Sequence, residues 1–499
     1  MDFPMFHLDW LNDRLLIALI AILHVCINHG LAVGFIPYIT RLEQQGVMKS
    51  GSHEITNKEW DAMVYKMMKV GFIITTTLGA MTGVGIWLSV SVVSPSSIAS
   101  LIRVFYWAWF IEWLVFVTEV VLILIYFLTW KNANKSLKAK MRHIKFGWFL
   151  SIFSWITMAI IVSILGFMMD PGNWNSNHSL INGFTNPIYM PQLLFRTPTA
   201  MLVGGIFGSV LATIFTKRNT ELRARAIKQS AIWILVWAPL SLAGAIFYYN
   251  AMPQAMIENL STAVTTLEFS QYYKLLKYII IGAISMVLVF AALGLWKPQK
   301  IRFAMAIIPC IMAFGFLGIF ERVREFIRKP YVIGGYMYSN LLRKEDYPLY
   351  KKDGILKYAT YTTTPEVTES NKVEAGRNVF ILTCSRCHTT QGINSVVGVF
   401  ERMYGKGKPF DEGSIASYTK GMHNGRTFMP EFPGNQKELD ALAAYIKHLQ
   451  QTGDVIEGAQ NEGVTVNPNQ SVAAVVKLME KQEKAKADSA AAANVAKNK

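Results

Sequence analysis

The sequence predicts an all-α protein: a polytopic bundle of about eight transmembrane helices with both termini outside, followed by a small all-α C-terminal domain. Composition is the first indication, because 52% of the 499 residues are hydrophobic and only 16% are charged. The second is a set of eight apolar stretches, each long enough to cross a hydrocarbon layer of about 30 Å. The third is a change of composition beyond Pro330 toward Tyr, Lys, Asp and Thr.

The eight stretches share the length and apolarity of membrane-spanning helices. They run approximately over residues 14–39, 68–93, 103–129, 145–169, 192–216, 228–250, 273–296 and 300–320. No cleavable signal peptide is expected, because acidic residues precede the first stretch and no small-residue cleavage site follows it. Cys26 and Cys310 lie in apolar runs and are interpreted as core residues, so no disulfide framework is implied.

The charge of the connecting loops predicts the orientation of the bundle. Three connections are rich in Lys and Arg and are therefore expected in the cytoplasm, at residues 131–145, 217–228 and 297–302. The connections at 170–190 and 251–272 contain no Lys or Arg, so they face outward. With eight crossings both termini end outside. Cytoplasmic loops that contact anionic lipid account for most of the net charge of +16, and a nucleic acid partner need not be invoked.

Composition divides the chain into four segments: a membrane domain at 1–330, a polar linker at 331–373, a soluble domain at 374–455 and an Ala/Lys-rich tail at 456–499. Within the soluble domain, Glu374 to Cys384 suits a short amphipathic helix. Asn435 to Gln450 has apolar residues at helical spacing. The tail carries little information.

The segment Cys384-Ser385-Arg386-Cys387-His388 spells C-x-x-C-H, the attachment sequence of a c-type haem. The two thiols add to the vinyl groups of one haem, and the imidazole of His388 binds its iron. A zinc or thiol-redox site is the alternative, but the chain has only four cysteines and no second Cys/His pair completes a tetrahedral site. Because haem c is attached outside the cytoplasmic membrane, the motif places this segment on the outer side, in agreement with the loop charges.

The order of the soluble domain is C-x-x-C-H, then Thr427-Phe428-Met429-Pro430, then a closing helix with Tyr445. This order resembles class I cytochrome c across residues 374–450. The resemblance implies His388 as the proximal and Met429 as the distal iron ligand. A thioether opposite an imidazole raises the reduction potential and leaves no open position for a substrate, which suits electron relay. Three other side chains are competing distal candidates: Met403, Met422 and His423.

Ionisable groups lie at membrane depth, where they are energetically costly and therefore candidates for function. They are His24, His29, Glu112, Glu119, Arg196, Glu321, Arg322, Arg324, Glu325 and Arg328. Glu112 and Glu119 share one helix face about 10 Å apart, so stacked carboxylates could pass protons. The alternatives are two acids hydrogen-bonded to neighbouring Ser, Thr or Trp side chains, and an interior His24 with its hydrogen bonds satisfied.

The membrane part resembles subunit I of cytochrome bd-type oxidases over residues 1 to about 335. The residues that carry the resemblance, in order, are Arg14 and His24, the run 82–85 (Thr-Gly-Val-Gly), Glu112 and Glu119, Asn186-Pro187, and the segment 325–331 (Glu-Phe-Ile-Arg-Lys-Pro-Tyr).

The resemblance implies two membrane haems of b or d type. His24 would be an iron ligand of one haem and Glu325 of a second, adjacent haem. Glu112 and Glu119 would line the proton route to them. Imidazole and carboxylate are reasonable ligands for iron that must keep a position open for oxygen.

The resemblance also implies that Arg14 and Arg328 pair with haem propionates. Two positions depart from the family, because the His and Met ligands of its third, low-spin haem are replaced by Arg196 and Ile280, neither of which can bind iron. The outer loop that forms the quinol site in that family is only about twenty residues long here. We therefore expect neither that haem nor quinol oxidation. Arg196 is expected to neutralise a propionate or one of the site glutamates Glu112, Glu119 and Glu325, or to be a snorkelling or buried ion-paired arginine.

These features predict a respiratory oxidoreductase of the terminal oxidase kind in a bacterial cytoplasmic membrane, with the cytochrome c domain on the periplasmic side. An external cytochrome c-like protein would reduce the His388 haem, and electrons would pass to the membrane haems, where dioxygen is reduced. A second bd-like membrane subunit is an expected partner. One alternative is an electron-transfer subunit of a larger complex that handles nitrogen oxides or quinone without reducing dioxygen. Another is a membrane anchor for cytochrome c without membrane haems.

Overall fold

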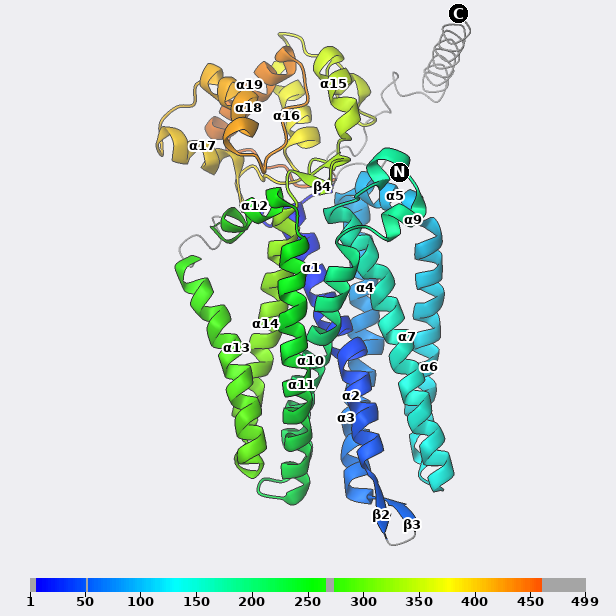
Figure 1. Ribbon diagram of the computed structural model, residues 1–499. Helices are drawn as coiled ribbons and strands as arrows, with labels where there is room; N and C mark the ends of the chain where they lie inside the picture. Colours follow the sequence, from blue (N-terminus) through cyan, green and yellow to red (C-terminus); the bar gives the residue numbers. More distant parts are fainter. Residues whose placement is uncertain (1–5, 51–52, 266–272, 460–499) are drawn as a thin grey trace, which may run out of the picture. The chain divides into compact units, whose positions relative to one another are not determined.

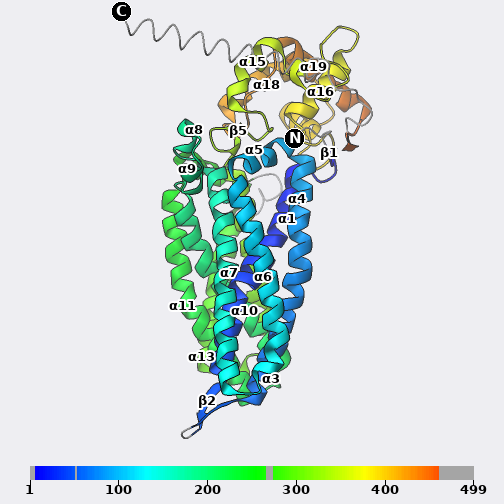
Figure 2. The same cartoon turned by 90° about the vertical axis from the view of Figure 1, so that its right-hand side faces the viewer.

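The computed structural model describes residues 6–50, 53–265 and 273–459 (Figure 1). The chain forms two compact units. The membrane unit comprises residues 16–91 and 97–337, and the C-terminal unit comprises residues 1–15, 92–96 and 338–499. The predicted tail lies outside the described residues from position 460 onward. The predicted all-α fold class is confirmed: long helices run side by side in the membrane unit, and short helices form the C-terminal unit (Figure 2).

Seven helical spans among the described residues are long and apolar enough to cross a membrane. Two spans are compound. The first runs through α1 (Asp13–Ile27), the π-helical η1 (Asn28–Phe35) and α2 (Ile36–Gln45). The second runs through α3 (Lys58–Ile74), η2 (Thr75–Gly79) and α4 (Ala80–Val93). The others are α6 (Tyr106–Ala133), α7 (Leu137–Met169), α10 (Tyr189–Phe215), α11 (Glu221–Ala251) and α14 (Phe303–Ile327). The predicted span at 273–296 is α13 (Tyr273–Trp296), in which residues 280–296 count as a shorter apolar helix.

Two spans begin earlier than their hydropathy predicts. The second begins at Lys58 rather than at 68, and the fourth begins at Leu137 rather than at 145. Lys140, predicted to lie in a cytoplasmic loop, is therefore inside α7 and fully buried. Its ammonium group pairs with Glu43 and Asp61, and this pairing offsets the cost of burying a charge.

The remaining elements of the membrane part are short. They are β2 (Val47–Ser50) and β3 (His53–Thr56), which form an antiparallel hairpin, α5 (Pro95–Val104), α8 (Trp174–Asn177), α9 (Leu180–Phe184), α12 (Gln254–Thr265), η4 (Pro298–Lys300), β4 (Tyr331–Ile333) and β5 (Met337–Tyr338). The innermost helix is α10, which packs against η1, α7, α11 and α14. Figure 2 shows α6 and α7 lying side by side.

The C-terminal unit is built on two crossing helices, α16 (Lys372–Thr383) and α19 (Gln436–Thr452), which match the two helices predicted there. They approach closely at Gly376, where an added Cβ would lie 2.0 Å from the carbonyl oxygen of Ala441. Phe380 and Tyr445 pack together beside this crossing. The other elements are β1 (Phe6–His7), η5 (Lys344–Asp346), α15 (Tyr347–Asp353), η6 (Leu356–Tyr358), α17 (Val396–Tyr404), α18 (Glu412–Gly425) and β6 (Gly458–Ala459).

The segment expected to be a linker contains β4, β5, η5, α15 and η6, and from Tyr338 onward it is part of the C-terminal unit. Glu438 of α19 holds it in place, because its carboxylate accepts hydrogen bonds from the backbone N–H groups of Ile355 and Leu356, each at 2.9 Å. The N-terminal segment also belongs to this unit, since β1 pairs antiparallel with β6.

Candidate functional site

The C-x-x-C-H loop begins where α16 ends. Cys384 is the C-cap of that helix, and its carbonyl oxygen accepts the backbone N–H groups of Cys387 at 3.0 Å and His388 at 2.9 Å. Both cysteines are free thiols rather than a disulfide. Burial raises the pKa of Cys384 to about 11, so this thiol is protonated near neutral pH. A redox-active cysteine has the opposite property, a lowered pKa, so the thiol-redox alternative finds no support here.

The imidazole of His388 is oriented by a backbone carbonyl. Its Nδ1 atom lies 3.1 Å from the carbonyl oxygen of Asn394. Because a carbonyl only accepts hydrogen bonds, Nδ1 carries the ring proton and Nε2 carries the lone pair that can bind a metal. The side-chain amide of Asn394 also donates to the carbonyl of Cys387 at 2.7 Å, which fixes the turn. These residues fit a covalently attached haem with His388 as its iron ligand.

Across residues 6–50, 53–265 and 273–459, no group of three or more His, Cys, Asp or Glu side chains could hold a metal ion.

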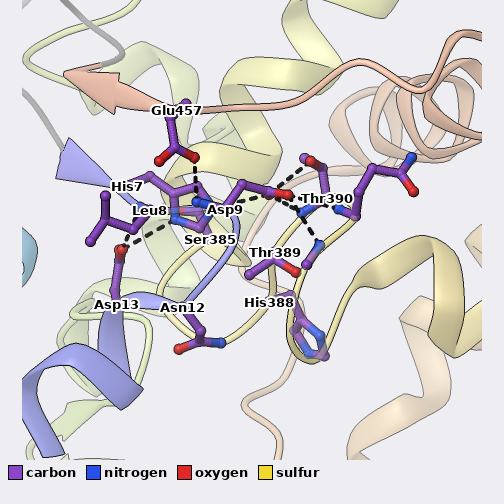
Figure 3. Close-up of polar contacts among 12 residues, drawn as sticks. His7, Leu8, Asp9, Asn12, Asp13, Ser385, His388, Thr389, Thr390 and Glu457 are labelled. Atoms are coloured by element: carbon purple, nitrogen blue, oxygen red, sulfur yellow. Dashed lines mark hydrogen bonds and ion pairs between the residues drawn. The ribbon is translucent and has the colours of Figure 1, made fainter. Parts of the chain in front are cut away.

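Asp9 of the N-terminal segment binds the chain directly after His388 (Figure 3). Its carboxylate accepts the Thr390 hydroxyl at 2.7 Å, the Thr390 backbone N–H, and the backbone N–H groups of Gln391 at 2.9 Å and Gly392 at 3.1 Å. Although burial alone would raise the pKa of Asp9, its hydrogen bonds from His7 and from this loop lower it to about 2. Asp9 is therefore an anion held by a ring of donors.

Further N-terminal side chains contact the C-x-x-C-H loop itself. The Asn12 amide donates to the carbonyl of Cys387 at 2.6 Å. Asp13 forms a buried ion pair with Arg386, at 3.0 Å. The Nη1 atom of Arg14 lies 3.5 Å from the Cys387 sulfur, so in this structure Arg14 is next to a haem c attachment residue. We call residues 7–14 the N-terminal clasp.

Met429 lies in the loop between α18 and α19. Its backbone N–H donates to Arg426 at 2.8 Å, and its carbonyl oxygen accepts from Nδ1 of His423 at 2.5 Å. His423, a competing distal candidate, thus supports the loop that carries Met429. Met403 is 40% exposed on α17. Met429 stays the predicted distal ligand.

In the membrane unit, His24 of α1 has hydrogen-bond partners at both ring nitrogens. Nε2 is 2.7 Å from the Asn28 amide and Nδ1 is 3.0 Å from the Thr82 hydroxyl. Because an amide N–H only donates, Nε2 is the acceptor and Nδ1 carries the proton. For iron to bind Nε2, the amide of Asn28 has to rotate away. His24 thus has the hydrogen bonds of a satisfied interior histidine, and its Nε2 lone pair becomes available to a metal once the Asn28 amide moves.

Glu325 lies near the C-terminal end of α14, between two arginines. Its carboxylate oxygens are 3.6 Å from Arg322 and 3.6 Å from Arg328. Arg328 is buried, and its Nη1 atom donates to the carbonyl of Val332 at 2.6 Å. The structure therefore brings together the predicted haem ligand Glu325 and the predicted propionate partner Arg328.

Arg196 is a buried ion-paired arginine. Its Nη2 atom lies 2.5 Å from Oε1 of Glu321, and its Nη1 atom lies 3.3 Å from Nδ1 of His29. The other carboxylate oxygen of Glu321 accepts from Arg324 at 2.9 Å. Two guanidinium groups thus share one carboxylate in the interior, as buried charges require. Of the roles left open by the sequence, this is the buried ion-paired arginine, and its partner is Glu321 rather than one of the predicted site glutamates.

Glu119 of α6 is held by hydroxyl groups of α7. Ser154 donates to Oε1 at 2.7 Å and Thr157 donates to Oε2 at 3.1 Å. Glu112 lies two turns earlier on the same helix and is partly buried. These contacts match the alternative in which Glu119 is hydrogen-bonded to neighbouring Ser and Thr side chains. Hydroxyl groups can also carry protons, because they both donate and accept hydrogen bonds.

Comparisons with known proteins agree with the two parts of the chain. The family model described as "Cytochrome C oxidase, cbb3-type, subunit III" matches residues 371–446, which include α16, the C-x-x-C-H loop and Met429. The C-terminal unit contains a class I cytochrome c domain. The predicted resemblance across 374–450 is thereby confirmed.

A solved structure, the bd oxidase from Geobacillus thermodenitrificans, is similar over 66% of this chain and 90% of that chain. The sequence identity is 15% and the TM-score is 0.53, which shows a shared fold. The predicted bd oxidase-like helical bundle is confirmed at the level of fold. No curated protein matches the sequence.

Sequence reasoning missed two groups of residues. The first is the N-terminal clasp on the cytochrome c domain, whose only signal was the concentration of acidic residues ahead of the first span. The second is a buried cluster of Glu43, Asp61, Lys140 and His143, whose residues lie on three helices. A charge-based reading assigns such residues to loops, so their burial was not visible from the sequence.

Proposed function

We propose that this protein is an oxidoreductase of the terminal oxidase kind, in which the cytochrome c domain receives electrons from an external redox protein and delivers them to haems in the membrane unit. The observation that carries this proposal is the presence of a cytochrome c domain and a bd oxidase-like helical bundle in one chain. Dioxygen is the proposed acceptor.

The cytochrome c domain provides the residues of an electron relay. Cys384 and Cys387 attach the haem, and His388 and Met429 are its proposed axial ligands. When bound, this haem supplies one-electron transfer without an open position for substrate. Asn394 sets the tautomer of His388. Asp9 holds the adjoining loop, so the imidazole keeps its orientation.

In the membrane unit, His24 and Glu325 are the proposed ligands of two haems of b or d type. Arg328, beside Glu325, is placed to bind a propionate. The reduction of dioxygen to water consumes protons, and Glu119 and Glu112 are the proposed carriers. The Ser154 and Thr157 hydroxyl groups keep the Glu119 carboxylate directed toward α7.

The proposed location is a bacterial cytoplasmic membrane, with the cytochrome c domain on the periplasmic side. The Lys/Arg-rich connections and the outer location of haem c attachment both support this orientation. A second bd-like membrane subunit is a proposed partner. The α6 helix exposes a series of large apolar side chains that lipid or such a subunit would cover: Tyr106, Trp107, Phe110, Ile111 and Trp113.

A second candidate function is an electron-transfer subunit whose membrane haems do not bind dioxygen. Both candidates use the same two parts of the chain, and they differ in whether a membrane haem binds dioxygen. A reduced-minus-oxidised spectrum with haem extraction distinguishes the candidates. Haem b or d with a carbon monoxide-sensitive spectrum supports the oxidase. Low-spin haem that ignores carbon monoxide supports the electron-transfer subunit, and haem c alone contradicts both.

A further inference from the structure

A cluster of buried ionisable side chains lies where α2, α3, α6 and α7 meet, at the end of the membrane unit near the β2–β3 hairpin (Figure 1). Its members are Glu43, Asp61, Tyr126, Lys140 and His143. Lys140 is 0% exposed and Glu43 is 1% exposed. Charged groups are rarely buried so completely unless they are paired, so each contact of the cluster carries information.

Lys140 joins the two carboxylates. Its Nζ atom lies 2.6 Å from Oε1 of Glu43 and 2.5 Å from Oδ1 of Asp61. The second oxygen of Asp61 accepts from the amide of Asn134 at 2.6 Å. Asn134 is exposed at the C-terminal end of α6, so Asp61 connects the buried cluster to the surface.

The contacts of His143 show that the cluster holds an additional proton. Nε2 lies 2.8 Å from the carbonyl oxygen of Tyr126 and must donate to it. Nδ1 lies 2.7 Å from Oε1 of Glu43. At that distance a proton lies between the two atoms, either as an imidazolium beside a carboxylate or as an imidazole beside a carboxylic acid. In both cases this proton and the charge of Lys140 neutralise the carboxylates of Glu43 and Asp61.

One face of α7 leads from this pair toward Glu119. His143, Gly147, Ser151 and Ser154 follow one another at helical spacings of four, four and three residues, so they share a face. The distance from His143 to Ser154 along the helix axis is about 16 Å. Ser151 is buried, and Ser154 donates to Glu119 at 2.7 Å.

Side chains from the neighbouring helices meet this face at Gly147. A Cβ atom at Gly147 would lie 2.7 Å from the Thr40 hydroxyl and 2.9 Å from the Tyr126 ring. The Tyr126 hydroxyl donates to Oε2 of Glu43 at 2.6 Å. Hydroxyl groups therefore extend from the cluster onto the α7 face, where Thr40 donates to the carbonyl of Ile36 at 3.0 Å and Ser151 donates to the carbonyl of Gly147 at 2.8 Å.

We propose that the Glu43–His143 pair is a proton-loading site that supplies Glu119 along this face of α7. This inference rests on the proposed function, which requires protons at the membrane haems. In the step, the proton shared by Glu43 and His143 leaves, and the Glu119 carboxylate receives one. The hydroxyl groups of Tyr126, Thr40, Ser151 and Ser154 each accept one proton and release another, which requires Thr40 and Ser151 to turn their O–H bonds away from the carbonyls of Ile36 and Gly147. The cluster then carries one negative charge and Glu119 is neutral. A proton from water at the Asp61 end restores the neutral cluster, and no electron moves.

The experiment measures proton uptake during reduction of the full-length protein in lipid nanodiscs. A chemical reductant is mixed rapidly with the protein in weakly buffered medium, a pH-indicator dye reports uptake, and haem absorbance reports reduction. The variants are Glu43→Gln, which leaves the Lys140–Asp61 ion pair intact, and Ser151→Ala. Ser209→Ala is the matched control, because Ser209 is a buried serine of α10 that donates to Ile206 of its own helix at 2.6 Å.

We expect Glu43→Gln and Ser151→Ala to slow proton uptake about tenfold or more, with the haem spectra and the Ser209→Ala variant unchanged. Uptake in Ser151→Ala at the rate of Ser209→Ala would overturn the proposal, even if Glu43→Gln failed to fold. If the cluster only stabilises the packing of the helices, Ser151→Ala and Ser209→Ala take up protons at the same rate. If the absorbance spectrum of the wild-type protein showed no membrane haem, the proposed function would be wrong. The haem absorbance is recorded separately from the signal of the pH-indicator dye, so this failure is distinguishable from a failure of the proton route.

Discussion

Asp9 accepts a hydrogen bond from the hydroxyl of Thr390 at 2.7 Å, although 381 positions separate the two residues in sequence. Thr390 lies two residues after His388, the proposed haem ligand, so the loop is held by a segment outside the matched range 371–446. The same segment continues into α1, the helix that carries His24. Residues 6–15 thus belong to the C-terminal unit, which contains the cytochrome c domain, and they lead directly into the first span.

The first prediction concerns this contact. In Asp9→Asn, one carboxylate oxygen becomes an N–H₂ donor that faces the backbone N–H groups of Gln391 and Gly392. We expect a loss of about 1–3 kcal/mol in the stability of the cytochrome c unit, because buried donors lose their acceptor. Denaturant unfolding followed by the haem c absorbance measures it. Glu412→Gln is the control, since Glu412 forms exposed ion pairs worth about 1 kcal/mol or less.

The pH dependence of the same variant follows from the sign of the pKa shift. The pKa of Asp9 is lowered from 3.8 to about 2, so its contribution is present above pH 3.8 and is lost as the pH falls toward 2. Wild-type protein should therefore lose stability across that window faster than Asp9→Asn. Parallel acid unfolding curves for the two proteins would contradict the anionic role of Asp9.

The second prediction tests the distal ligand of haem c. In Met429→Leu the thioether is removed while the side chain keeps a similar size, so we expect a lower reduction potential and new carbon monoxide binding by the reduced haem c. Redox titration and the spectrum with carbon monoxide measure the two effects. Met403→Leu and Met422→Leu serve as controls. If one of these variants, and not Met429→Leu, changed the potential, the assignment of Met429 would be wrong.

The third prediction concerns Glu325. If its carboxylate binds iron, Glu325→Ala removes one membrane haem signal from the reduced-minus-oxidised spectrum and leaves the haem c bands unchanged. Glu258→Ala is the control, because Glu258 is an exposed acid of α12 in the same unit. A complete spectrum in Glu325→Ala would limit Glu325 to its ion pairs with Arg322 and Arg328.

Local patterns were sufficient to predict the fold class and the haem c site. The membrane spans are continuous apolar runs, and Cys384, Cys387 and His388 lie within five consecutive residues. Long-range pairings were not predictable in the same way. No sequence pattern predicts the contact of Asp9 with Thr390, because the composition of a polar segment does not show which of its acidic residues binds a distant loop.

Charge alone was also ambiguous for buried groups. Lys140 lies in a Lys/Arg-rich stretch between two apolar runs, which predicts a loop, whereas two carboxylates from other helices enclose it. Similarly, the sequence left Arg196 with several roles, and only the packing of α10 against α14 shows its contact with Glu321.

The last prediction concerns the contribution of the Arg196–Glu321 ion pair to the stability of the membrane unit. Arg196 and Glu321 are both buried, with their closest atoms 2.5 Å apart. Arg196→Met leaves Glu321 paired with Arg324, whereas Glu321→Met removes the carboxylate that the buried Arg196 and Arg324 share. We therefore expect Glu321→Met to lower the stability of the membrane unit by about 3–5 kcal/mol and Arg196→Met to lower it less. The double variant should be more stable than Glu321→Met, because one of the two cations is then removed.

Unfolding of the three variants in detergent provides the double-mutant cycle. Additive losses in the double variant would show that the two side chains act independently, and would exclude Glu321 as the group that Arg196 neutralises.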